Sequence, residues 1–226
     1  MANGYVAVVV DALRASATAA MLLDAGAREL LVVREVEQAI AAKRVMPDVL
    51  LFGERGGLPP EGFDYGNSPR DVAAARGRRV VFTTTTGAAR LVSAWGAKAV
   101  YMGTTVNASA VAAAVAAHNA DVVLIPAGLS GDPTFDAQED WVAAAAIAIA
   151  AGAEIGNGHQ DFVRWRDRIE AEGLPRLFES APHAQKLRAV DLDDDIALCA
   201  QTNITDAVPM AVRENRYGVI VRDAGR

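Results

Sequence analysis

The stretch YVAVVV, Tyr5–Val10, carries no charged residue and ends directly before Asp11. A strand with one face in water alternates apolar and polar residues, whereas this run is apolar without interruption. The run therefore predicts a strand that is covered on both faces, as in the parallel sheets of α/β proteins.

Similar apolar runs recur along the chain at 30–33, 49–52, 80–84, 99–102 and 122–127. The segments between most of them are rich in Ala, Leu, Glu and Arg, and they predict helices at 16–25, 36–45, 69–76, 87–95 and 108–118. Strands that alternate with helices in this way indicate an α/β fold with a largely parallel sheet.

The pattern changes after Gly128. We expect a long helix over 137–151, more helix through 160–201, and two strands, 208–214 and 217–223, around Glu214-Asn215-Arg216. These two strands are read as a C-terminal hairpin at an antiparallel edge of the sheet. Because no low-complexity linker interrupts the chain, we expect one α/β domain over residues 1–226, a three-layer α/β/α sandwich.

Composition excludes several classes of protein. The net charge of −6 argues against non-specific nucleic-acid binding. The longest apolar tract, Trp141–Ala151, is too short to span a bilayer, and no basic segment precedes an apolar run at the N-terminus. We therefore expect a cytoplasmic protein without nucleic-acid or membrane partners. Cys199, the only cysteine, lies in an apolar stretch and predicts buried packing.

Ligands of α/β proteins gather at the carboxyl ends of the strands, and several of these ends carry polar residues here. Asp11 follows the first strand, and the third strand ends in Gly53-Glu54-Arg55-Gly56-Gly57. Asp11 is either a helix N-cap or a metal ligand. Leu13 stands where phosphatases that form an aspartyl-phosphate would have a second aspartate, so nothing supports that intermediate.

Two further strand ends add hydroxyl and carboxylate groups. Thr83–Gly87 lies between a strand and a helix, where it could cap the helix or hold a phosphate or sulfonate. Glu139-Asp140 opens the alanine-rich helix, where acids stabilise the helix dipole or, with Asp11 and Glu54, complete an oxygen-rich site. Hard oxygen ligands suit Mg²⁺ rather than zinc.

With these residues assembled, the chain resembles the 2-phosphosulfolactate phosphatase family over nearly its whole length. The resemblance rests on segments that follow the predicted strands and open the predicted helices: Asp11–Thr18, Gly53–Gly57, Gly62–Pro69, Thr83–Ala88, Glu139-Asp140, Ser180–His183 and Asp195–Cys199. On this resemblance the glycine-rich loop 52–71 folds over a small anion, with Glu54 and Arg55 turned inward.

The resemblance implies a Mg²⁺-dependent phosphatase that hydrolyses (R)-2-phospho-3-sulfolactate to 3-sulfolactate and phosphate, a step of coenzyme M formation. Asp11, Glu54 and Asp140 would hold the metal, directly or through water, and Arg14 would neutralise the phosphate. The residues expected in catalysis are Asp11, Arg14, Glu54 and Asp140, and those expected to bind substrate are Arg55, Asn67, Ser68, Thr84, Thr85, Thr86, Gly87 and Arg90.

Three positions depart from the family's pattern: Ala17 replaces Ser, Thr86 replaces Asn, and Ala88 replaces Thr. These changes motivate an alternative function, a non-catalytic small-anion-binding protein with the same fold. We also expect a homodimer, because alanine-rich helices pack closely and a sheet edge needs cover.

Overall fold

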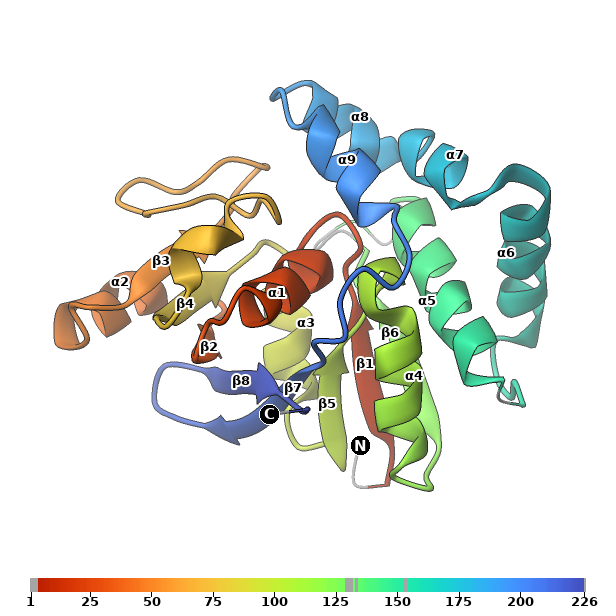
Figure 1. The fold of residues 1–226 in the computed structure, drawn as a ribbon, viewed down its shortest axis with the longest axis horizontal. Coiled ribbons are helices and arrows are strands. Elements are labelled where there is room, and N and C mark those ends of the chain that lie inside the picture. The colour runs from red at the N-terminus through yellow and green to blue at the C-terminus, as the bar shows by residue number, and fades with distance from the viewer. Residues whose placement is uncertain (1–3, 129–131, 133, 153, 226) are drawn as a thin grey trace.

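The computed structural model describes residues 4–128, 132, 134–152 and 154–225. An eight-stranded sheet runs through it in the spatial order β3-β4-β2-β8-β7-β5-β1-β6 (Figure 1). The strands are β1 (Val6–Val10), β2 (Glu29–Val32), β3 (Leu50–Gly53), β4 (Arg79–Thr83), β5 (Ala99–Met102), β6 (Val122–Pro126), β7 (Pro209–Glu214) and β8 (Val219–Asp223). Every pair formed among strands β1–β6 is parallel: β1 pairs with β5 and β6, and β4 pairs with β2 and β3. The predicted α/β fold is confirmed.

Helices follow most strands, as the alternating pattern predicts. They are α1 (Ala15–Asp24), α2 (Val36–Val45), α3 (Gly87–Ala94), α4 (Ala108–Ala116), α5 (Gln138–Ala151), α6 (His159–Glu172), α7 (Leu174–Glu179), α8 (Pro182–Arg188) and α9 (Asp193–Cys199), with short 3₁₀ turns at Val72–Ala75 and Thr105–Asn107. We call α7–α9, residues 174–199, the helical cap. Figure 1 shows α8 and α9 above the carboxyl end of β1.

Strand β1 is buried along its whole length, as its sequence predicts. Val6, Val8 and Val10 pack in one core cluster with residues of α4 and α5. Ala7 and Val9 belong to a second cluster, with residues of α1 and α3. Because successive side chains of a strand point to opposite faces, both faces of the sheet are covered by helices here. Cys199 packs in the first cluster and is fully buried, and burial raises the pKa of its thiol.

The C-terminal hairpin lies in the middle of the sheet, so its predicted place at an edge was wrong. Strand β8 pairs with β2 and strand β7 pairs with β5, both antiparallel, and β3 and β6 form the edges. The hairpin fits because β8 is apolar at Val219, Ile220 and Val221, which are all buried. Beside them Gly218 approaches the β2 backbone so closely that a Cβ atom would lie 2.2 Å from the carbonyl oxygen of Val32.

Two helix predictions also need correction. Residues 69–76 form only the 3₁₀ turn Val72–Ala75, and the Ser68 hydroxyl before it accepts a hydrogen bond from the Arg70 amide and donates one to Asp195. The long helical stretch expected over 160–201 is divided into α6 and the cap. Helices α7 and α8 each begin with a proline in the first turn, which suits a helix start and not a helix interior. Within the described residues, no helix is long and apolar enough to cross a membrane.

Candidate active site

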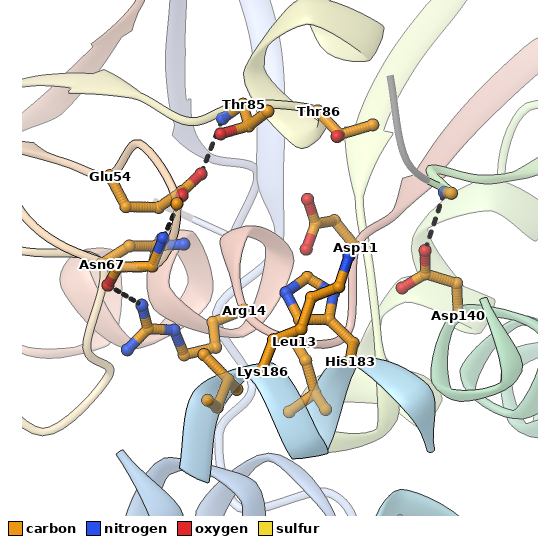
Figure 2. A pocket seen from close by; sticks show the side chains of 14 residues that line it. Asp11, Leu13, Arg14, Glu54, Asn67, Thr85, Thr86, Asp140, His183 and Lys186 are labelled. Carbon is orange, nitrogen blue, oxygen red and sulfur yellow. Dashed lines mark hydrogen bonds between the residues drawn. The ribbon is translucent and has the colours of Figure 1, made fainter. Parts of the chain in front are cut away.

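A cavity of about 150 Å³ lies where the carboxyl ends of β1, β3, β4 and β6 face the helical cap (Figure 2). Drug-sized ligands take pockets of about 300–1,000 Å³, so this cavity suits a smaller molecule. Its lining residues are Asp11, Leu13, Arg14, Glu54, Gly56, Gly57, Asn67, Thr85, Thr86, Gly128, Asp140, His183, Lys186 and Leu187. The glycine-rich loop supplies Glu54, Gly56 and Gly57 to this lining.

Asp11 lies at the end of β1 and is 8% exposed. Its Oδ1 accepts a hydrogen bond of 3.0 Å from the amide of Ala15, the first residue of α1, but the N-cap position itself is occupied by Arg14, so Asp11 is not the N-cap. Burial raises the pKa of Asp11 to about 6, against the attraction of His183 and the Ala15 bond and with help from Glu54 and Glu139. Ionisation of Asp11 therefore costs more free energy than in water, because the side chain is buried and other carboxylates lie near it.

Glu54 holds two loops together at the cavity. Its Oε1 accepts from the Thr85 amide at 2.7 Å and its Oε2 from the Gly57 amide at 2.9 Å (Figure 2). Gly57 has a φ of 89°, a conformation that glycine adopts readily. Glu54 thus fixes the glycine-rich loop against the turn between β4 and α3.

Asp140, in the first turn of α5, connects two other strand ends. Its Oδ1 accepts from the Ala12 amide at 2.8 Å and its Oδ2 from the Gly128 amide at 2.9 Å. Burial, together with the charges of Glu139 and Asp11, holds the pKa of Asp140 well above its usual range, although both amide bonds act to lower it. Asp11, Glu139 and Asp140 are therefore close enough for the charge of one carboxylate to raise the pKa of another.

The neighbouring Glu139 faces the cap. Its Oε1 lies 3.3 Å from Nδ1 of His183, and its Oε2 is buried without a hydrogen-bond partner. Burial acts to lower the pKa of His183, but the hydrogen bond and charge of Glu139, with the charges of Asp11 and Glu54, outweigh it and raise that pKa. These carboxylates therefore favour the protonated form of His183 in the cavity wall.

Arg14 is held by a buried cluster around Asp195 of α9. Asp195 is fully buried and accepts hydrogen bonds from Nη1 of Arg14, Nε of Arg70 at 2.9 Å and Oγ of Ser68 at 2.7 Å. Nη2 of Arg14 donates to the carbonyl oxygen of Gly57 at 2.9 Å (Figure 2). The guanidinium is therefore fixed in direction, and the cap is connected to the β1–α1 turn and to the glycine-rich loop.

The donor set at this cavity fits a divalent cation in charge and atom type. The raised pKa values of Asp11 and Asp140 and the unpartnered Oε2 of Glu139 indicate negative charge that the protein does not neutralise fully. Oxygen donors of this kind suit Mg²⁺. Among the described residues, however, no three His, Cys, Asp or Glu side chains are grouped as ready metal ligands.

The cavity brings together most of the residues that sequence predicts for the site. The predicted residues in its lining are Asp11, Arg14, Glu54, Asn67, Thr85, Thr86 and Asp140. Three more support it from behind. Ser68 donates to Asp195, the Thr84 hydroxyl accepts from the Ala88 amide at 3.0 Å, and Gly87 packs against Asp11.

Arg55 and Arg90 do not line the cavity, and the expectation that Arg55 turns inward was wrong. Nη2 of Arg55 donates to the carbonyl oxygen of Arg34 and to the hydroxyl of Thr83, each at 3.0 Å. Nε of Arg90 donates to the carbonyl oxygen of Ala127 at 3.1 Å. Both arginines satisfy backbone acceptors of loops near the site, because such acceptors need donors.

Sequence reasoning assigned no role to the two cationic residues of α8 in the lining, His183 and Lys186, nor to Asp195 behind Arg14. His183 and Asp195 lie in segments that carry the family resemblance, and this was the only signal for them in the sequence. Of the three departures from the family's pattern, only Thr86 lines the cavity, whereas Ala17 and Ala88 are fully buried in core clusters.

Comparison with known proteins agrees with this geometry. Residues 1–214 match the family model described as 2-phosphosulpholactate phosphatase. A probable 2-phosphosulfolactate phosphatase of Deinococcus radiodurans is 39% identical over 92% of this chain and 88% of the relative. Proteins of the same description from Carboxydothermus hydrogenoformans (36% identical, 89% of this chain, 84% of the relative) and Pseudothermotoga lettingae (32%, 94% and 92%) are also similar. The chain belongs to the 2-phosphosulfolactate phosphatase family.

Proposed function

We propose that this protein is a Mg²⁺-dependent phosphatase that hydrolyses (R)-2-phospho-3-sulfolactate to 3-sulfolactate and phosphate. The observation that carries the proposal is a small cavity with carboxylates on one wall and cations on the other, in a chain of this family. The names of the similar proteins supply the substrate class. Coenzyme M formation, which consumes 3-sulfolactate, is the biosynthetic role that we propose with it.

The cavity has polar groups for a ligand: the hydroxyl of Thr85 can donate to a phosphate oxygen, whereas the amide oxygen of Asn67 can only accept, as from a water molecule. Oδ1 of Asn67 and Oγ1 of Thr85 belong to lining residues and are buried without hydrogen-bond partners. Buried polar atoms are nearly always hydrogen-bonded in native proteins, so these two indicate places for a polar ligand or water. Thr85 and Thr86 precede the N-terminus of α3, where backbone amides favour anions.

Asp11, Glu54 and Asp140 would hold Mg²⁺, directly or through water. When bound, the ion polarises the phosphoryl oxygens and lowers the pKa of a coordinated water. Because backbone amides occupy both oxygens of Glu54 and of Asp140, these two residues keep the loops in place whether or not an ion is present. Burial raises the pKa of Asp11 to about 6, and a cation bound beside it would favour its ionised form.

The remaining steps use side chains of this chain. Arg14, held by Asp195, neutralises charge on the phosphate with a guanidinium that is already oriented. His183, protonated beside Glu139, gives a proton to the oxygen of the departing hydroxy acid as the phosphorus–oxygen bond breaks. Water supplies the oxygen that the phosphate gains.

Phosphate release from (R)-2-phospho-3-sulfolactate tests the proposal, measured while Mg²⁺ is titrated into protein stripped with EDTA. We expect release that saturates with Mg²⁺ and is partly supported by Mn²⁺. Full activity in EDTA would contradict the metal dependence. Saturable binding without release, on this and other phosphorylated hydroxy acids, would favour the non-catalytic anion-binding protein. The departures at Ala17 and Ala88 give that alternative little support, because both side chains pack in the core.

We also propose a homodimer, on a different surface from the hairpin edge expected at first. Strand β6 is an edge of the sheet, with Val122 38% and Val123 43% exposed, and Trp141 of α5 is 37% exposed. An uncovered apolar edge strand invites pairing, which a second copy would satisfy. Light scattering at micromolar concentration checks the dimer, and a monomer mass would contradict it.

A further inference from the structure

Lys186 differs from the other cations of the cavity in having no carboxylate partner. Arg14 pairs with Asp195 and His183 pairs with Glu139, whereas no ion pair within 4.0 Å among the described residues includes Lys186. Its ammonium lies 4.4 Å from the ring centroid of Phe135, a cation–π contact that leaves the charge available to an anion.

The surroundings of Lys186 favour an anionic ligand. The carboxylate of Asp132 lies within its field, but Oδ1 of Asp132 accepts hydrogen bonds from the amide and hydroxyl of Thr134 at 3.0 and 2.6 Å. Phe135 also packs edge-on against His183, with ring centroids 6.1 Å apart. One aromatic ring therefore contacts both cationic residues that α8 supplies to the cavity.

The two walls of the cavity differ in charge. The strand ends contribute Asp11, Glu54 and Asp140, and the face of α8 contributes His183 and Lys186, with Leu187 beside them. If the metal and the phosphate of the substrate lie at the strand ends, the rest of the substrate faces α8. Leu13 and Leu187 line the cavity as apolar contacts for a short carbon chain.

The substrate keeps two anionic groups after the phosphate is removed, a carboxylate and a sulfonate. The chemistry of the cations indicates which of them binds each group. A planar guanidinium matches a planar carboxylate, and Arg14 is fixed in direction by Asp195 and Gly57. An ammonium is a point charge with three donors on a flexible stem, and it suits the three equivalent oxygens of a sulfonate.

Resting on the proposed function, we propose that Lys186 binds the sulfonate of the substrate and determines specificity for sulfonated phosphate esters. Arg14 is left to the carboxylate and the phosphate. The ammonium of Lys186 takes no part in bond breaking, so its contribution belongs to substrate binding and appears in KM.

The experiment compares Lys186→Met with wild type on three phosphate esters: 2-phospho-3-sulfolactate, 2-phospholactate, which lacks the sulfonate, and the phosphate ester of 2-hydroxyethanesulfonate, which lacks the carboxylate. Hydrogen bonds to charged groups contribute enough that KM should rise about 10-fold to 100-fold on the two sulfonated esters. The change on 2-phospholactate should be several-fold smaller, and Lys186→Arg should recover most of the loss.

Lys98→Met is the matched control, because Lys98 donates to the carbonyl oxygen of His118 and does not line the cavity. It should leave all three KM values unchanged. Lys186 is exposed, so its replacement should not alter the thermal melting curve. The assignment would be overturned if KM rose equally on the three esters. It would also be overturned if KM rose only on 2-phospho-3-sulfolactate and 2-phospholactate, the two esters that carry a carboxylate.

Wild-type turnover tests the proposed function by itself. Should wild type release no phosphate, calorimetric titration with 3-sulfolactate and with lactate still tests Lys186 in the same variants. Weaker binding of 3-sulfolactate alone by Lys186→Met supports the assignment, and unchanged binding of both acids overturns it.

Discussion

The two walls of the cavity are built in different ways. On the strand-end wall, Glu54 and Asp140 bind backbone amides of neighbouring loops, and Asp11 binds the first amide of its own helix. Where the cap meets this wall, side chains are held by other charged side chains: Arg14 of the β1–α1 turn by Asp195 of the cap, 181 residues away in the chain, and His183 of the cap by Glu139.

This difference separates what each wall can do. Backbone amides fix the carboxylates of the strand-end wall without neutralising their charge, so their surplus negative charge remains for a cation. Where the cap meets the strand ends, Arg14 and His183 each lie beside one carboxylate, which fixes their direction, whereas no ion pair among the described residues includes Lys186. On the proposed function, the strand-end wall would hold the metal and the phosphate, and the cap wall would hold the rest of the substrate.

The largest effect is expected where the cap joins the strand ends. Asp195→Asn removes the charge of a fully buried side chain that binds Arg14, Arg70 and Ser68. Breaking a buried ion pair by removing one partner costs about 3–5 kcal/mol, so the free energy of unfolding should fall by that amount. Urea unfolding followed by circular dichroism measures the loss.

Asp194→Asn provides the control for this change. Asp194 is the adjacent aspartate and pairs with the same Arg70 at 2.6 Å, but its side chain is 77% exposed. Exposed pairs contribute little, so the loss should be hard to resolve beside that of Asp195→Asn. Equal losses in the two variants would show that burial of Asp195 does not stabilise the connection between the cap and the strand ends.

The strand-end wall could be predicted from sequence because its signal is local. Each of its carboxylates follows an apolar strand or opens a helix, and parallel strands bring such positions to one edge of a sheet. Asp11, Glu54 and Asp140 were found in this way. The prediction failed for Arg55 and Arg90, because residue type alone does not tell an arginine that binds a ligand from one that satisfies backbone carbonyls.

The cap wall and the central hairpin could not be predicted in the same way. Which side chains of α8 and α9 reach the cavity depends on contacts between segments more than a hundred residues apart, such as Arg14 with Asp195. The hairpin enters the sheet between β2 and β5 although it is the last element of the chain, because order along the chain does not determine order in a sheet. Only the resemblance to a family indicated the segments of His183 and Asp195.

A second prediction concerns the surplus charge of the strand-end wall. The pKa of Asp11 is raised from 3.8 to about 6 in the folded protein, so the native state binds more protons than the unfolded chain between these values. Stability is then fully present below pH 4 and is lost as pH rises through 6, by about 3 kcal/mol in all. Asp11→Asn cannot ionise and escapes this loss.

Urea unfolding of both proteins in EDTA, at pH 4.5 and pH 7.5, measures the effect. The advantage of Asp11→Asn over wild type should grow by about 2 kcal/mol between these two pH values. The same variant should lose more than about 100-fold in turnover, because it removes a proposed metal ligand. An advantage that does not change with pH would mean that the strand-end wall carries no surplus negative charge.

The smallest effect is expected from the close packing that places Asp11. Gly87 begins α3 against the start of α1, and a Cβ atom there would lie 2.5 Å from Oδ2 of Asp11 and 2.7 Å from Cβ of Ala15. Rotation of Asp11 relieves the first contact, but Cβ of Ala15 is fixed to the buried start of α1. Gly87→Ala should therefore lower the free energy of unfolding by about 1–3 kcal/mol, as overpacking does, and lower turnover by displacing Asp11.

Gly156→Ala, with no atom within 4 Å of its Cβ position, is the control and should leave thermal melting and turnover unchanged. If Gly87→Ala behaved like this control, α3 would be free to move away from α1, and the strand-end wall would be less rigid than its hydrogen bonds indicate.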